Sequence, residues 1–246
     1  AAILRGSDIV SRKTDGDTAD APRQHGTDIA AILVGRDDGG FSGIVPDANL
    51  YAAGVFRSSE KGESKAKLES ILIGLDWLLA QQIRVLNLSI AGPRHSLLEK
   101  SMATTREKEV IVVAAAGNNG PLSAPAYPAA YANVIAVTAI DQNRRPYVRA
   151  NQGEYIALAA PGVNLAIPGP AGKMRRISGT SYSAAIVTGV VAEILRDRPN
   201  AKEADVMATL RKAAVDLGRS GRDTVFGWGL AQYKPTCGRT AKTAKN

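Results

Sequence analysis

The sequence predicts one α/β domain built on a doubly wound, mostly parallel β-sheet with helices on both faces. Short apolar segments alternate with longer segments whose apolar residues recur at helical spacing, which favours right-handed crossovers between parallel strands. Residues 109–115 contain an unbroken apolar run, which is typical of a strand covered on both faces. No internal repeat or interdomain linker divides the 246 residues, so a single domain is expected.

The individual elements follow from this alternation. Apolar residues at helical spacing predict helices over residues 26–34, 65–81, 96–108, 181–196 and 201–214. Short apolar runs predict strands over residues 49–55, 83–89, 109–115, 134–140 and 155–159. Residues 14–22 and 37–43 are rich in turn-forming residues and are expected to be loops.

Composition places the chain among ordinary globular proteins. Hydrophobic residues make up 45% and charged residues 22% of the sequence, enough to bury a sizeable core. No apolar run reaches the length of a membrane span, and the first residues lack the pattern of a signal peptide.

The excess of positive charge is concentrated at one end. Half of the net charge of +8 lies in residues 234–246, which contain no acidic residue. Because no aromatic residues are interleaved with the basic ones, we expect a solvated tail rather than a nucleic-acid-binding segment. The single cysteine, Cys237, lies in this tail and cannot form an internal disulfide, so the redox compartment stays open.

Three short segments contain residues suited to catalysis. The first, residues 25–27, places His25 at the start of a predicted helix, where the backbone holds a general base in position. The second, residues 114–121, follows a buried strand at the edge where parallel sheets bind ligands, and the Asn118 amide can donate there to an oxyanion. The third, residues 178–185, places Ser181 on the first turn of a buried helix, near free N–H groups and the positive end of the helix dipole.

Each segment alone also has an ordinary structural interpretation, as an exposed histidine, a Gly-Asn turn or an N-cap serine. In this order, however, they resemble the histidine, oxyanion and nucleophile motifs of the subtilase family of serine proteases. Further resemblance is found in residues 87–93, 127–137, 159–163 and 227–229. The resemblance implies a subtilisin-like three-layer architecture, with a peptidase domain over residues 1–233 and a basic tail over residues 234–246.

The resemblance also implies a role for each matching residue. Ser181 is expected to be the nucleophile, His25 the general base, and Asn118 the oxyanion donor beside the Ser181 backbone N–H. The edge expected to pair with the main chain of a peptide contributes Ser89, Ala91 and Gly92. The expected pocket walls are small and uncharged and contribute Ala115, Ala116 and Gly117. Ala126 is expected at the pocket floor, so medium to large apolar side chains should fit.

The sequence departs from the family pattern at the catalytic aspartate, which in the family ends an apolar strand before the histidine. Four aspartates precede His25 and none of them ends such a strand: Asp8, Asp15, Asp17 and Asp20. Residues 1–10 instead match the strand that follows the aspartate. We therefore expect the domain to lack its first strand, with the triad aspartate upstream in an active protease. The alternative is a degenerate pseudoprotease that binds peptides without cleaving them.

A second departure concerns the nucleophile helix, where Ser183, Ala185 and Ile186 replace the alanine, proline and histidine that are common in the family. These positions are expected to affect packing rather than chemistry. Residues 35–41 offer two acids in a turn near a family calcium loop but lack its pattern, so no metal is predicted.

No cofactor is expected either, and a nucleotide-binding enzyme is disfavoured because no glycine-rich phosphate loop follows a first strand. The implied partners are a polypeptide substrate and the chain's own upstream segment or prodomain, with no nucleic acid and no membrane span. The resemblance alone implies secretion or a location in the cell envelope.

Overall fold

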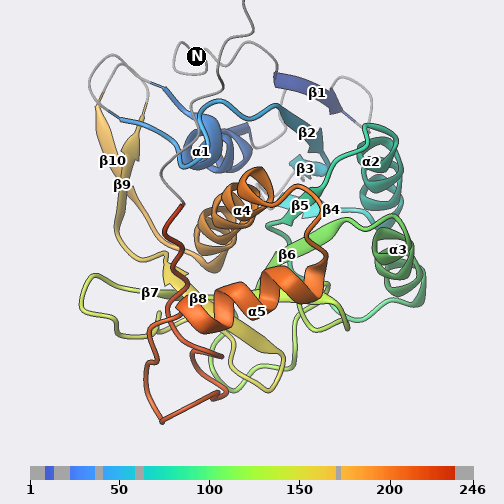
Figure 1. The fold of residues 1–246 in the computed structure, drawn as a ribbon. Coiled ribbons are helices and arrows are strands. Elements are labelled where there is room, and N and C mark those ends of the chain that lie inside the picture. The colour runs from blue at the N-terminus through green and yellow to red at the C-terminus, as the bar shows by residue number, and fades with distance from the viewer. Residues whose placement is uncertain (1–8, 14–22, 37–40, 59–63, 170–172, 236–246) are drawn as a thin grey trace, which may run out of the picture.

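The computed structural model describes residues 9–13, 23–36, 41–58, 64–169 and 173–235 (Figure 1). Over these residues it confirms the α/β fold class, with a parallel sheet flanked by helices. The described helices are α1 (Arg23–Val34), α2 (Leu68–Ala80), α3 (Ser96–Glu107), α4 (Thr180–Asp197) and α5 (Glu203–Ala213).

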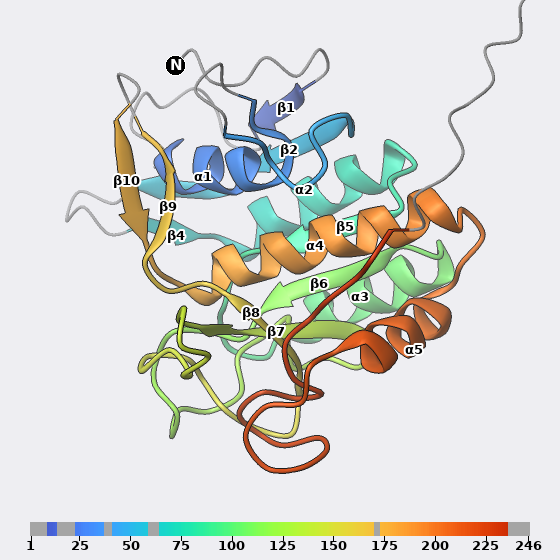
Figure 2. The same cartoon turned by 60° about the vertical axis from the view of Figure 1, so that its left-hand side comes forward.

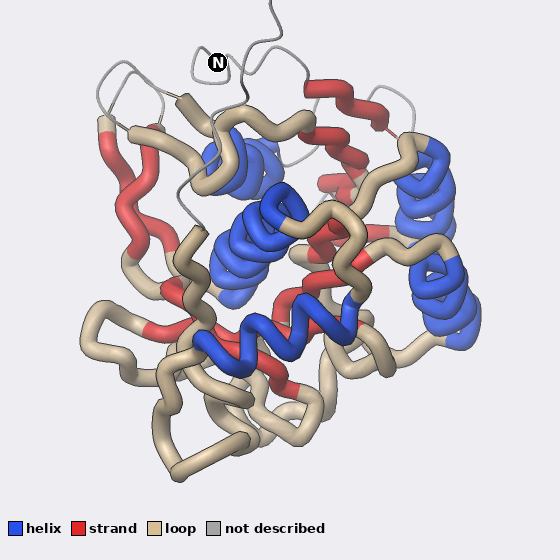
Figure 3. Tube along the Cα trace, in the orientation of Figure 1, coloured by secondary structure: helices blue, strands red, loops and turns tan. Residues whose placement is uncertain are grey.

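The strands form one larger sheet and three two-stranded ones (Figure 3). The larger sheet is parallel, in the order β5 (Val85–Leu88), β6 (Ile111–Ala115), β7 (Val134–Ile140) and β8 (Ile156–Pro161). A second parallel pair joins β1 (Ile9–Lys13) to β2 (Leu50–Gly54). The antiparallel pairs are β3 (Phe56–Ser58) with β4 (Ser64–Ala66), and β9 (Leu165–Pro168) with β10 (Met174–Ile177).

The fully buried strand β6 shows why helices cover both faces of the larger sheet. Its side chains alternate between the two faces, as the pleat of a strand requires. Ile111, Val113 and Ala115 pack in the cluster that contains α4 and α5 residues. Val112 and Ala114 pack in the cluster that contains α2 and α3 residues. The two helix pairs accordingly lie on opposite sides of the strands (Figure 2).

Several predicted bounds needed correction. The predicted helix 65–81 begins only at Leu68, because residues 64–66 pair with residues 56–58 as a hairpin. The β9–β10 hairpin was not predicted, since its strands of four residues are too short to show a clear alternation. The strand β1 at Ile9–Lys13 shares only residues 9 and 10 with the strand expected over residues 1–10.

Some predictions fall outside the described residues. They concern residues 1–8 with Asp8, the loop 14–22 with the other three aspartates, most of the acidic turn at 37–40, and the tail beyond residue 235 with Cys237. Of the helices that are described, none has both the length and the apolarity needed to cross a membrane.

Candidate active site

The predicted catalytic segments meet at the carboxyl edge of the parallel sheet. Strand β6 ends at Ala115 and leads directly to Asn118, and α4 begins at Thr180 after the β9–β10 hairpin. The first turn of α1, which carries His25, packs on α4 (Figure 2). Ligand sites in open α/β sheets lie at this edge, because the loops that leave parallel strands converge there.

Thr180 fixes the orientation of the Asn118 amide. The backbone N–H of Thr180 donates to Asn118 Oδ1 at 3.0 Å, and its hydroxyl donates to the same oxygen at 3.1 Å. The hydroxyl also accepts from the Gly117 N–H at 3.2 Å. With Oδ1 occupied by two donors, the Nδ2 group of Asn118 is directed to the side of Gly179 and remains available as a donor.

Gly117 is required for this turn. Its φ of +105° is a conformation that side-chain-bearing residues rarely adopt. A Cβ atom there would also approach the Ala126 Cβ and the Asn151 amide to 3.0 Å. The glycine therefore allows the chain to turn from β6 into the Asn118 loop.

The buried Asn151 holds the rest of that loop. Its Oδ1 accepts from the Asn119 N–H at 2.8 Å, and its Nδ2 donates to the Ala124 carbonyl at 3.0 Å. Its own backbone N–H donates to the Gly117 carbonyl at 3.1 Å. One fully buried side chain thus fixes both ends of the loop that presents Asn118.

Ser181 lies on the first turn of α4, and the residue is largely buried, with 9% of its surface exposed. Its carbonyl accepts from Ser89 Oγ at 2.9 Å. Ser89 Oγ in turn accepts from Asn87 Nδ2 at 2.9 Å, and Thr188 Oγ1 lies 3.1 Å from Asn87 Oδ1. This chain of hydrogen bonds ties α4 to the end of β5.

The unusual residues of α4 have packing roles, as predicted. Ser183 Oγ lies 3.0 Å from the carbonyl oxygens of both Ala160 and Pro161, so it ties the helix to the end of β8. Ala185 is fully buried in the cluster with α1 residues, and Ile186 packs against the same cluster.

His25 is half-buried between two aromatic rings. Its ring centroid lies 5.7 Å from that of Tyr182, the neighbour of Ser181, and 6.5 Å from that of Phe56. Burial lowers the pKa of His25 below that of a solvent-exposed histidine, because charging the ring would cost solvation. The His25 ring thus lies beside the first turn of α4, where an uncharged imidazole can accept a proton.

Among the described residues, no hydrogen bond or ion pair joins His25 to a carboxylate, and burial lowers the pKa of its ring. The nearest acid in sequence, Asp28, is paired with Arg175 and accepts from Gln24 Nε2 at 2.9 Å. The four aspartates that precede His25 lie outside the described residues.

The expected pocket residues carry no charge. Ala115, Ala116 and Gly117 are buried, and the Ala116 carbonyl accepts from Tyr155 Oη at 2.8 Å. Gly92 does not offer its main chain as expected, because its N–H and C=O both pair with Tyr127 at 2.9 Å. The exposed Ala91 has no backbone partner among the described residues.

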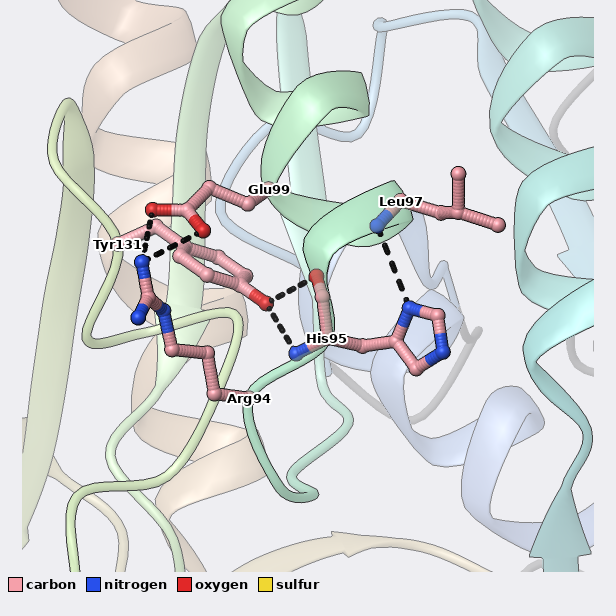
Figure 4. Close-up of polar contacts among 5 residues, drawn as sticks. All are labelled: Arg94, His95, Leu97, Glu99 and Tyr131. Carbon is pink, nitrogen blue, oxygen red and sulfur yellow. Dashed lines mark hydrogen bonds and ion pairs between the residues drawn. The ribbon is translucent and has the colours of Figure 1, made fainter.

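The second histidine, His95, is placed quite differently (Figure 4). It caps α3, and its Nδ1 accepts from the Leu97 N–H at 3.2 Å. Tyr131 Oη lies 2.8 Å from both the backbone N and O of His95, and Arg94 forms an ion pair with Glu99 beside it. This exposed cluster belongs to the start of a helix and not to the site around Ser181.

Fold and site together show an α/β protein that brings a serine, a histidine and an asparagine to one edge of a parallel sheet. A family comparison agrees with this class: the model described as Peptidase_S8, subtilase family, matches residues 6–229. The chain therefore belongs to the subtilase family.

Individual relatives show the same relationship. The chain is 32% identical over 212 residues to the minor extracellular protease Epr of Bacillus subtilis (strain 168), covering 85% of this chain and 32% of the relative. It is 34% identical over 208 residues to the M-protease of Shouchella clausii (strain KSM-K16), covering 84% of this chain and 53% of the relative. The chain thus spans about a third and a half of these proteins.

A solved structure of the protease domain of PatA has the same fold. The TM-score is 0.79 with 24% identity, covering 94% of this chain and 86% of that one.

Several residues that shape the site were not predicted from the sequence. Thr180, Asn151 and Tyr182 act through contacts with segments distant in the chain, so no local pattern marks them. The residue type gave a signal only for Asn151, because a buried asparagine needs hydrogen-bond partners for its whole amide.

Proposed function

We propose that this domain is a serine endopeptidase of the subtilisin type, with Ser181 as nucleophile, His25 as general base and Asn118 as oxyanion donor. The observation that carries the proposal is the fixed Asn118 amide beside the first turn of α4, with His25 against Tyr182 on the same turn. These roles are those described for subtilisin itself.

The reaction would proceed through an acyl-enzyme. Ser181 Oγ attacks the carbonyl carbon of the peptide bond while His25 accepts the hydroxyl proton. Asn118 Nδ2 and the Ser181 backbone N–H donate to the resulting oxyanion. His25 then protonates the leaving amine, and water attacks the ester with His25 again as base.

The triad carboxylate is proposed to come from a strand upstream of this sequence. Among the described strands, β2 and β5 each pair on one side only. Tyr51 and Ala53 of β2 pack against the apolar cluster that contains Leu86 and Leu88 of β5, so the two open edges adjoin one core. A further strand between them would join the two parallel sheets and end at the carboxyl edge.

The test compares the 246-residue chain with a form extended upstream, each with a Ser181→Ala control. The extended form should cleave a peptide ester or anilide with a kcat on the order of 10⁴-fold higher than that of the 246-residue chain. Replacing the aspartate of a serine protease triad lowers kcat by a similar factor. Equal full activity would assign the acid to residues before His25. No activity in either form would favour the pseudoprotease, for which the absence of a described carboxylate on His25 is the supporting observation.

We also propose that the pocket accepts medium to large apolar side chains before the cleaved bond. Its proposed lining, from Ser89 to Gly92 and from Ala115 to Gly117 with Ala126, contains no charge that could pair with a charged side chain. Profiling with a peptide library tests this, and a preference for Lys, Arg, Asp or Glu would contradict it.

The domain boundaries and the compartment are further proposals. Residues 1–233 are proposed to form the peptidase domain and 234–246 a basic tail, because the last described contacts end near Tyr233, which donates to Asp197 at 2.7 Å.

Secretion or the cell envelope is supported by an extracellular relative. Fractionation of the native cells would test the location, and co-purification of an upstream segment would test a prodomain partner.

A further inference from the structure

We propose that Asp28 and Arg175 are positioning residues that hold the first turn of α1, and with it His25, against Tyr182. This inference deepens the proposed function and rests on it, since His25 is the proposed base. The two residues are remote in sequence and belong to different elements, α1 and the β9–β10 hairpin.

The geometry joins three elements at one buried point. The Asp28 carboxylate is only 3% exposed and forms an ion pair with Arg175, whose side chain is 29% exposed. The same carboxylate oxygen accepts from Gln24 Nε2 at 2.9 Å, which fixes the residue just before His25. Arg175 also lies close enough to Tyr182 to lower its pKa, opposing the larger effect of burial, which raises it.

His25 is linked to this pair through the first turns of α1. Asp28 lies one helical turn after His25, so its side chain fixes the rotation of the turn that carries the imidazole. Arg175 comes from the hairpin that leads directly into Ser181. A link between these two elements would therefore set the distance between the proposed base and the proposed nucleophile. Catalysis is sensitive to errors of about 1 Å in such a distance.

The pair is poorly explained as a stabilising device. Both charges lose hydration, and the buried Nε–H of Arg175 has no hydrogen-bond partner among the described residues. Buried ion pairs with unmet donors often contribute little to stability, while removing one partner leaves an unpaired buried charge. A positional role explains why charges are placed here.

The experiment uses the upstream-extended protein with the variants Asp28→Asn, Arg175→Met and the double variant, and Glu109→Gln as the control. Glu109 pairs with Lys202 at an exposed site away from His25. Each single variant should lower kcat by on the order of 10- to 100-fold with little change in KM. The double variant should recover part of the loss because no unpaired charge remains. The control should retain its kcat.

A second measurement follows the two histidine ring signals by NMR in a Ser181→Ala background, with His95 as the internal reference. Among the described residues, Tyr182 contacts the His25 ring, and the Asp28–Arg175 pair lies one helical turn further along α1. Asp28→Asn leaves the Arg175 cation unpaired and should lower the pKa of His25. Arg175→Met leaves the Asp28 anion unpaired and should raise it.

A merely structural pair would give lower melting temperatures without opposite shifts of His25 and without loss of kcat. That result would overturn the proposal. If the extended parent itself fails to cleave peptides, the proposed function fails, whereas absence of the opposite NMR shifts would separately overturn the link between the pair and His25.

Discussion

The chain contains two histidines, and each begins a helix or lies within its first turn, yet their surroundings differ in almost every respect. His25 is half-buried between Phe56 and Tyr182, which come from other elements. His95 is exposed, and its ring accepts a hydrogen bond from Leu97 two residues later. A similar place in secondary structure thus gives a base candidate in one case and a helix cap in the other. Long-range packing, and not the position at a helix start, therefore decides the surroundings of each histidine.

The largest difference between the two histidines is expected in kcat. In the upstream-extended protein, His25→Ala should lower kcat by about 10⁴ to 10⁶, the range that loss of a triad residue produces in subtilisin. His95→Ala should leave kcat unchanged, because its ring caps α3 and lies apart from the turn that carries Ser181. Steady-state kinetics with active-site titration would measure both. Comparable losses in the two variants would contradict the distinction.

A smaller loss of kcat is expected when Asn118, the proposed oxyanion donor, is replaced or when a contact that orients its amide is removed. Asn118→Leu should lower kcat by about 10²- to 10³-fold with KM nearly unchanged, since the donor acts on the transition state. Thr180→Val removes the hydroxyl that bonds Asn118 Oδ1 and Gly117 N–H, and should cause part of that loss. Rescue by Thr180→Ser, which keeps the hydroxyl, would support positioning of the amide. Unchanged kcat in both Asn118→Leu and Thr180→Val would count against it.

Burial of His25 should also appear in the pH dependence of stability. Because its pKa is lowered in the folded state, the unfolded chain binds the proton more readily. The free energy of unfolding should therefore fall as the pH drops below the ordinary histidine value of about 6.5. Urea denaturation of the 246-residue chain in a Ser181→Ala background, with and without His25→Gln, isolates this contribution. A pH dependence that persists unchanged in His25→Gln would disprove the assignment.

The smallest effect concerns the cap. His95→Ala should destabilise the fold by about 0.5–1 kcal/mol, because the Leu97 N–H at the start of α3 loses its acceptor. His95→Ser restores a capping oxygen and should recover the loss. Chemical denaturation of the three proteins measures the difference, and a more stable His95→Ala variant would show that the cap has no net value.

Much of the architecture was determined by the sequence alone. The uninterrupted apolar run in β6 required cover on both faces, and helical spacing marked α2 through α5 to within a few residues. Ser181 and Asn118 were predicted because their segments resemble subtilase motifs in the order of the family, and their roles remain predictions. Short elements were missed, as in the β9–β10 hairpin, because strands of four residues carry too little periodicity to be recognised.

Only the tertiary structure decided which partners hold these residues. Thr180 orients Asn118, Asn151 fixes the loop around it, and Arg175 reaches Asp28 across 147 positions of chain. Such contacts leave no periodic signal, because each depends on one side chain meeting another at a distance set by the packed core. Periodicity encodes which face of an element is buried, whereas the geometry of a site depends on how the buried faces fit together.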